Sequence, residues 1–249
     1  MINRNQIIPP LVERLRTQEF VKAIWEGGAA AFNRVDEWSD IDIAVIVPDD
    51  KTKETFAIVE EELKKISTIE KLYEPAQSPW QGHEQKFYLL KNTSPFLLID
   101  LSIFKESAPD MLLEKEIHGN SLIHYDKTGI TKKFVFDELS HNKKIEKKLE
   151  TLKSSFEIFD CFTEKELNRG NFIEAIGFYN AFVLRPLVEL LRIKYSPEHF
   201  NFYTRYIHYE LPPDAVKKLQ TLFFISDPDE LRSKEKTAKE WFNSLISEF

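Results

Sequence analysis

The sequence predicts an α+β protein with an α/β domain over residues 1–138 and an all-α helical bundle over residues 139–249. Two observations support this prediction. Strand-like and helix-like hydrophobic patterns alternate in the first half of the chain, whereas the second half has almost only the helical period. The composition also changes near residues 130–142, which places the domain boundary there.

The predicted strands of the first domain are short apolar runs bounded by Gly, Pro or polar residues. They cover residues 20–25, 41–47, 68–73, 85–91 and 96–104. The predicted helices have apolar residues three and four apart, or prolines where a first turn tolerates them. They cover residues 7–18, 29–33 and 51–66. Strands that alternate with helices in this way indicate an α/β domain.

The second domain has the helical period throughout, and its predicted helices cover residues 142–168, 172–194, 213–225 and 228–247. The helix at 172–194 is apolar nearly all round, which is typical of a central bundle helix. On this helix Arg185 and Glu189 are four residues apart and can form an ion pair. A run of lysines is expected on a solvated face rather than at a phosphate site; it consists of Lys143, Lys144, Lys147 and Lys148.

The charge of the chain limits its classes of partner. Thirty-four Lys and Arg residues against 41 Asp and Glu residues give a formal net charge of −7. Long nucleic acids are therefore not expected as partners, because their binding depends on Lys and Arg side chains that neutralise phosphates. A small anionic substrate carried with metal ions, or a cationic small molecule, is compatible with this charge.

The sequence also limits the expected location. No run of eighteen apolar residues is present, so no membrane-spanning segment is expected. The first residues lack the apolar stretch of a signal peptide, and the cytoplasm is the expected location. The single cysteine, Cys161, excludes an internal disulfide and a cysteine-based zinc site.

Three acidic residues stand out because they adjoin or interrupt apolar strands. Asp40 and Asp42 are two residues apart, so they project from the same side of a strand whose continuation is apolar. Two neighbouring carboxylates repel unless a cation lies between them. Asp100 lies inside another apolar strand, where an unpaired acid would be costly to bury. If the two strands are neighbours, the three acids converge in a layout suited to phosphoryl or nucleotidyl transfer around one or two magnesium ions.

The glycine pair Gly27-Gly28 follows a predicted strand and precedes a predicted helix start. Glycines let the backbone approach a phosphate closely, and a helix N-terminus offers free N–H groups. A glycine pair alone is most often a simple turn. Combined with Asp40 and Asp42 thirteen residues later, it becomes a specific signal for a phosphate-binding turn.

The order of these motifs resembles the nucleotidyltransferase superfamily related to DNA polymerase β. The matching elements are a strand, Gly27-Gly28, a variable loop, Ser39-Asp40-Ile41-Asp42 and Ile99-Asp100-Leu101, within residues 20–104. The helical second half is similar to the C-terminal domains of bacterial aminoglycoside and lincosamide adenylyltransferases. The resemblance implies a mixed sheet and a magnesium-dependent enzyme. Its expected reaction is the transfer of a nucleoside monophosphate, AMP from ATP, to a hydroxyl of a small molecule such as an antibiotic.

The resemblance also implies roles for individual residues. Asp40 and Asp42 would hold two magnesium ions, and Asp100 would either complete a metal site or act as the general base. The backbone of Gly27 and Gly28 would cradle the triphosphate, and Ser39 belongs to the same nucleotide-binding set. The chain departs from the family pattern in the turn, where the family often has Ser in place of Gly28 and an Arg and a Gly follow within the turn. These departures concern the nucleotide contacts more than the metal site.

Two other functions remain open from the sequence. The acceptor could be a protein side chain, as in an AMP-adding or antitoxin-like regulator. Alternatively, the chain could be an inactive nucleotide-binding module, although the presence of all three acids argues against it. His83 could act as a base near the acceptor, but an ordinary surface histidine is the preferred interpretation.

Overall fold

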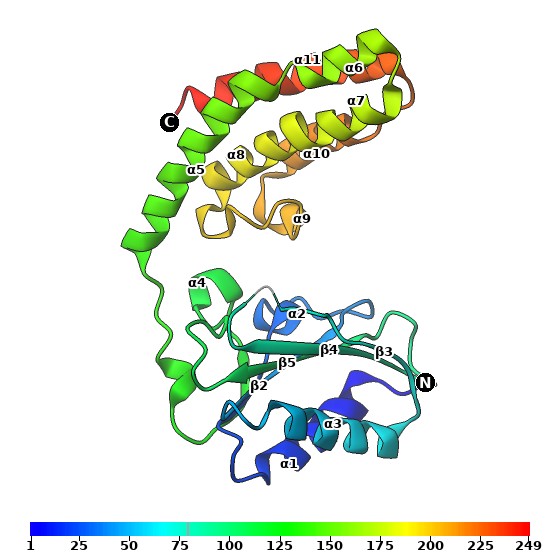
Figure 1. Ribbon diagram of the computed structural model, residues 1–249, viewed down its shortest axis with the longest axis vertical. Helices are drawn as coiled ribbons and strands as arrows, with labels where there is room; N and C mark the ends of the chain where they lie inside the picture. The colour runs from blue at the N-terminus through cyan, green and yellow to red at the C-terminus, as the bar shows by residue number, and fades with distance from the viewer. Residues whose placement is uncertain (79) are drawn as a thin grey trace. The chain divides into compact units, whose positions relative to one another are not determined.

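The computed structural model describes residues 1–78 and 80–249, which divide into two compact units, Met1–Phe136 and Asp137–Phe249 (Figure 1). The first unit contains a six-stranded sheet in the order β3-β4-β5-β2-β1-β6. Its strands are β1 (Ala23–Glu26), β2 (Ile41–Val47), β3 (Ile69–Tyr73), β4 (His83–Leu90), β5 (Ile99–Lys105) and β6 (Leu122–Asp126). Strands β2 and β5 are parallel and the other neighbouring pairs are antiparallel, so the predicted mixed sheet is confirmed.

Helices α1 (Arg4–Arg16) and α3 (Thr52–Ile66) cover one face of this sheet (Figure 1). Alternate residues of the two parallel strands point into the core on that side and are buried; they are Ile41, Ile43, Val45, Ile99, Leu101 and Ile103. Helix α1 begins at Arg4, earlier than predicted, because Asn3 and Gln6 form a capping box. The apolar spacing of the strands thus fixes which face of the sheet the helices cover.

The opposite face of the sheet carries the short helices α2 (Gly28–Ala31) and α4 (Lys115–His118) (Figure 1). A second apolar cluster covers part of this face, and its largest members are Trp25 and Phe104, whose rings stack 5.5 Å apart. The remaining residues of β2 and β5 also point to this side, because successive side chains of a strand alternate. Asp42 and Asp100 therefore lie on the face that α1 and α3 do not cover.

The second unit is a helical bundle in which no strand occurs among its residues, all of which the structure describes. Its α-helices are α5 (Glu138–Phe159), α6 (Phe162–Arg169), α7 (Phe172–Tyr179), α8 (Arg185–Tyr195), α9 (Ile207–Glu210), α10 (Pro213–Phe223) and α11 (Pro228–Ile246). A π-helical segment (Asn180–Leu184) joins α7 to α8, whose second residue is Pro186. The predicted α+β class, with a helical C-terminal region, is confirmed.

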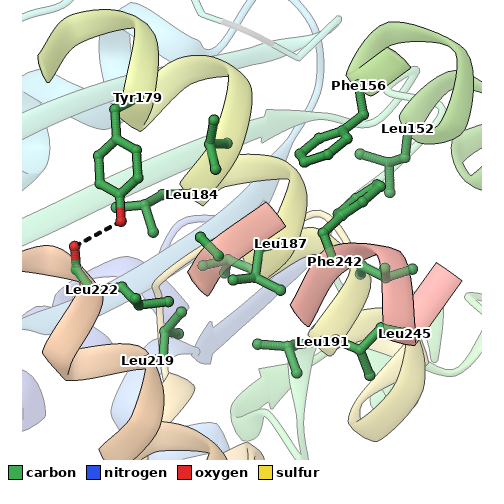
Figure 2. Close-up of a cluster of buried hydrophobic side chains, with 14 of the residues drawn as sticks. Leu152, Phe156, Tyr179, Leu184, Leu187, Leu191, Leu219, Leu222, Phe242 and Leu245 are labelled. Atoms are coloured by element: carbon green, nitrogen blue, oxygen red, sulfur yellow. Dashed lines mark hydrogen bonds between the residues drawn. The ribbon is translucent and has the colours of Figure 1, made fainter. Parts of the chain in front are cut away.

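The core of the bundle consists of apolar residues that recur three and four positions apart along its helices (Figure 2). The rings of Phe156 and Phe242 stack with centroids 3.8 Å apart, and the hydroxyl of Tyr179 donates to the carbonyl oxygen of Leu222 at 3.0 Å (Figure 2). The predicted helix at 142–168 is instead two helices, α5 and α6, separated at residues 160–161.

The predicted ion pair of the central helix is present, with Nε of Arg185 3.1 Å from Oε1 of Glu189. Nζ of Lys148 lies 2.6 Å from Oε2 of the same carboxylate, so this lysine pairs with a buried acid instead of extending from a solvated face. In the part of the chain that the structure describes, no helix combines the length and the apolar character needed to cross a membrane.

Candidate active site

Asp42 and Asp100 are direct neighbours on the parallel strands β2 and β5. Their Cα atoms are register partners, and adjacent strands lie about 4.8 Å apart. Both half-buried side chains therefore lie side by side on the open face of the sheet, which is the face that α1 and α3 do not cover. The structure thus brings together two of the three acids that the sequence singled out. Like charges opposite each other destabilise a sheet unless another group offsets them.

Asp40 precedes β2 and lies at the exposed mouth of the site. The partial burial of its carboxyl group raises the pKa of Asp40, an effect that a hydrogen bond from the backbone N–H of Leu98 opposes. The backbone N–H of Ile41 donates to the carbonyl oxygen of Leu98 at 2.9 Å. Hydrogen bonds therefore join Asp40 and Ile41 to the residues that lead into β5. Asp40 lies two residues before Asp42, so both side chains project toward the same face.

The glycine turn is joined to Asp42 by its backbone. The N–H of Gly27 donates to the carbonyl oxygen of Asp42 at 2.9 Å. Gly28 has a φ of +52°. A Cβ atom at Gly28 would lie 1.8 Å from Oδ2 of Asp42, whereas a Cβ atom at Gly27 would have nothing within 4 Å. The absence of Ser at position 28 therefore has a physical reason in this chain, because a side chain there would be strained and would displace the carboxylate of Asp42.

The helix after the glycine turn is shorter than the sequence pattern suggested. Helix α2 is a single turn, so it does not have the aligned peptide dipoles of a longer helix. The binding of a phosphate by the backbone at this point, including the N-terminus of α2, stays a prediction.

Ser39 forms hydrogen bonds within the loop that precedes β2. Its hydroxyl donates to Oδ1 of Asp36 at 2.7 Å and accepts from the backbone N–H of Asp36 at 2.9 Å. These bonds close a turn just before Asp40. The structure therefore shows a loop-forming role for Ser39, and its role as a nucleotide-binding residue stays a prediction.

Gln85 is a site residue that the sequence did not indicate. Its Nε2 donates to Oδ1 of Asp100 at 2.6 Å across the antiparallel strands β4 and β5. Phe87, two residues further along β4, is the register partner of Asp100. The sequence predicts a strand that contains Gln85 and Phe87, whose side chains share one face. It does not indicate that this strand pairs with the strand of Asp100.

His83 is buried, so its interpretation as a surface histidine is wrong. Its Nδ1 lies 2.6 Å from the hydroxyl of Ser78, and its ring contacts those of Trp80 and Phe104. Burial lowers the pKa of His83 to about 4. Because its register partner is Phe104, His83 lies about 13 Å along the sheet from Asp100. It is therefore a packing residue outside the acidic site.

Glu26 immediately precedes the glycine turn and is buried at the end of β1. Nη2 of Arg4, the first residue of α1, lies 2.5 Å from Oε1 of Glu26. Nε2 of His124 lies 3.7 Å from Oε2 of the same carboxylate, at a β-bulge in β6. The buried ion pair between Arg4 and Glu26 thus links α1 to the end of the strand from which the glycine turn starts.

The donor set at the site is suited to a hard divalent cation. Magnesium commonly takes one or two protein carboxylates and completes its shell with water and phosphate oxygens. The register pair of Asp42 and Asp100 matches this requirement. Within the described residues, however, no group of three or more His, Cys, Asp or Glu side chains is already arranged to hold a metal. The predicted set of three acid ligands is thus not preassembled.

The comparisons with known proteins give structural similarity only. No protein-family model and no curated protein matches the chain. An aminoglycoside 6-adenyltransferase from Bacillus subtilis is 13% identical, with 99% of this chain and 90% of that chain covered, at a TM-score of 0.37. A nucleotidyltransferase-like protein from Exiguobacterium sibiricum 255-15 is 12% identical, with 96% and 75% covered, at a TM-score of 0.41.

A third similar structure is a spectinomycin adenyltransferase from Enterococcus faecialis with ATP and spectinomycin. It is 12% identical, with 98% of both chains covered, at a TM-score of 0.38. At these identities and TM-scores the likeness carries no argument about function, which therefore depends on the residues of the site.

Proposed function

We propose that the chain is a magnesium-dependent nucleotidyltransferase that transfers a nucleoside monophosphate, AMP from ATP, to a hydroxyl of a small molecule. The observation that supports this proposal most strongly is the register pairing of Asp42 with Asp100, next to a glycine turn that contacts Asp42. Two carboxylates at one point of an open sheet face are suited to hold a cation against phosphate oxygens.

Each residue of the site has a proposed role. Asp42 and Asp100 would hold magnesium, with Asp40 as a further ligand at the mouth, and bound magnesium would stabilise negative charge on the reacting phosphates. The backbone of Gly27 and Gly28 would lie against the triphosphate, because neither residue has a side chain of its own. Asp100 would also accept the proton of the acceptor hydroxyl if its carboxylate is not fully engaged by the cation.

The reaction balances without any further reagent. The acceptor oxygen forms a bond to the α-phosphorus of ATP, and the bond from that phosphorus to the bridging oxygen of the β-phosphate breaks. Pyrophosphate leaves, and the proton of the hydroxyl passes to the base. Aminoglycoside- and lincosamide-like antibiotics are the first acceptors to test, because the motif resemblance includes enzymes that act on them.

The test is incubation of the protein with ATP labelled at the α-phosphate, magnesium and a panel of these acceptors. We expect pyrophosphate release together with a labelled small molecule, and neither product from an Asp42→Asn variant that folds normally. Label transferred to protein instead would favour the protein AMP-transferase alternative. ATP binding without label transfer to small molecules or to proteins of a cell extract would favour the inactive binding module.

A further inference from the structure

Gln85 connects β4 to the acidic site through one side-chain hydrogen bond. It faces Ser102 of β5, so it reaches Asp100 diagonally on the same face of the sheet. Its Nε2 lies 2.6 Å from Oδ1 of Asp100. An ionised carboxylate only accepts hydrogen bonds, so this contact requires the NH₂ group of the amide, not its oxygen, to face Asp100.

The residues next to Gln85 on β4 form contacts of a different kind. Nζ of Lys86 lies 3.1 Å from Oε1 of Glu60, and Oε1 of Glu84 lies 3.1 Å from Nζ of Lys105. These side chains alternate with Gln85 and therefore project from the opposite face. On that face opposite charges offset each other. On the acidic face, the donor that β4 offers to Asp100 is neutral, so the bond orients the carboxylate without cancelling its charge.

We propose that Gln85 is a positioning residue that orients Asp100 for a cation or a proton and preserves its negative charge. This inference rests on the proposed function of the same site. A lysine at position 85 would form an ion pair with Asp100 and compete with a metal ion. An apolar residue of similar size would leave the carboxylate without the bond that orients it. Hydrogen-bond partners of this kind typically change metal affinity or activity by about 10- to 100-fold when they are removed.

Two substitutions separate orientation from charge. Gln85→Leu removes the donor, and we expect kcat to fall by about 10- to 100-fold. KM for ATP should change by a smaller factor than kcat, because Gln85→Leu keeps the charge of Asp100 and the residue acts through Asp100, not on the nucleotide. Gln85→Lys adds a competing cation, and we expect the affinity for Mn²⁺, used as the metal probe, to fall by about 10- to 100-fold in calorimetric titration without nucleotide.

The matched control is Glu84→Gln, which changes the adjacent residue on the opposite face of β4. It should keep both wild-type turnover and wild-type Mn²⁺ affinity. Gln85→Met replaces Gln85→Leu if the leucine variant fails to fold, and thermal melting identifies that case. Wild-type kcat in a folded variant without the donor, or wild-type Mn²⁺ affinity in Gln85→Lys, would overturn the inference.

The metal titration also separates this inference from the proposed function. If the wild-type protein binds Mn²⁺ but transfers no nucleotide, a loss of Mn²⁺ affinity in Gln85→Lys still supports the role of Gln85. If the wild-type protein transfers nucleotide and Gln85→Leu does so equally well, the positioning role fails while the proposed function stands.

Discussion

A Cβ atom on Gly28 would lie 1.8 Å from Oδ2 of Asp42, so a side chain at position 28 would displace the carboxylate of Asp42. Gly28 also has a φ of +52°, a conformation that glycine adopts without strain. Gly27 differs in both respects, because its φ is −104° and a Cβ there would meet open space. A substitution at Gly28 therefore tests the contact with Asp42, and the same substitution at Gly27 is its control.

Gly28→Ala should displace the carboxylate of Asp42 and disrupt the site. We expect turnover to fall by about 100-fold, the effect of displacing a reacting group by about 1 Å. Gly27→Ala should leave the carboxylate of Asp42 in place, because no protein atom lies within 4 Å of the added methyl group, and turnover should fall by less than in Gly28→Ala. Steady-state kinetics on both variants checks the prediction, and equal losses in the two would show that the contact with Asp42 is irrelevant.

The two paired acids should respond differently to substitution. Asp42→Asn should lower metal affinity and turnover together, since this residue is a proposed metal ligand. If Asp100 acts mainly as the base, Asp100→Asn should leave MgATP affinity within a few-fold while turnover falls by roughly two to four decades. If it is mainly a ligand, both quantities should fall. Wild-type turnover in a folded Asp100→Asn variant would remove this residue from the chemistry.

Glu26→Gln should destabilise the protein because the guanidinium of Arg4 loses its partner at a buried position. We expect a loss of about 1–3 kcal/mol in the free energy of unfolding. The control is Glu13→Gln, which breaks an exposed pair with Arg16 and should change that free energy by less than about 1 kcal/mol. Urea denaturation measures both variants, and similar small losses would mean that the buried pair is dispensable.

His83 should make the stability of the fold depend on pH. Burial lowers the pKa of His83 from its ordinary value of 6.5 to about 4, so between these values the unfolded chain binds a proton that the folded chain excludes. The free energy of unfolding should therefore fall as the pH decreases from 6.5 to 4, by an upper limit of about 3 kcal/mol.

A His83→Gln variant should show a flatter pH profile of stability over this window. The control is His208→Gln at an exposed position, which should keep the wild-type profile. Denaturation curves at several pH values provide the comparison. A wild-type slope in the His83→Gln variant would mean that other groups cause the acid sensitivity.

Elements with a strong local pattern were predictable from the sequence. Strand β2 was expected over residues 41–47 and is found at Ile41–Val47, because an apolar run there ends at Pro48. Strand β6 was not predicted, because its residues are exposed or half-buried and show no clear alternation. The break at residues 160–161 was missed because the apolar spacing continues across it.

The candidate site was only partly predictable. The sequence indicated Asp42 and Asp100 because an acid within an apolar strand requires an explanation. Their register depends on which strands pair, and long-range pairing leaves no local signal in one sequence. The contact between Gln85 and Asp100 was missed for the same reason. The close approach of Gly28 to Asp42 depends on where the Asp42 side chain lies, and residue spacing in the sequence does not specify that position.

The proposed function requires Asp42 and Asp100 to form one site for a metal ion and a nucleotide. Calorimetric titration of the wild-type protein with ATP, in magnesium and again in EDTA, tests this requirement. We expect the affinity for ATP to fall by at least about tenfold in EDTA, because the carboxylates would then repel the phosphates without a cation between them. Equal affinity for ATP in both solutions would contradict the proposed site.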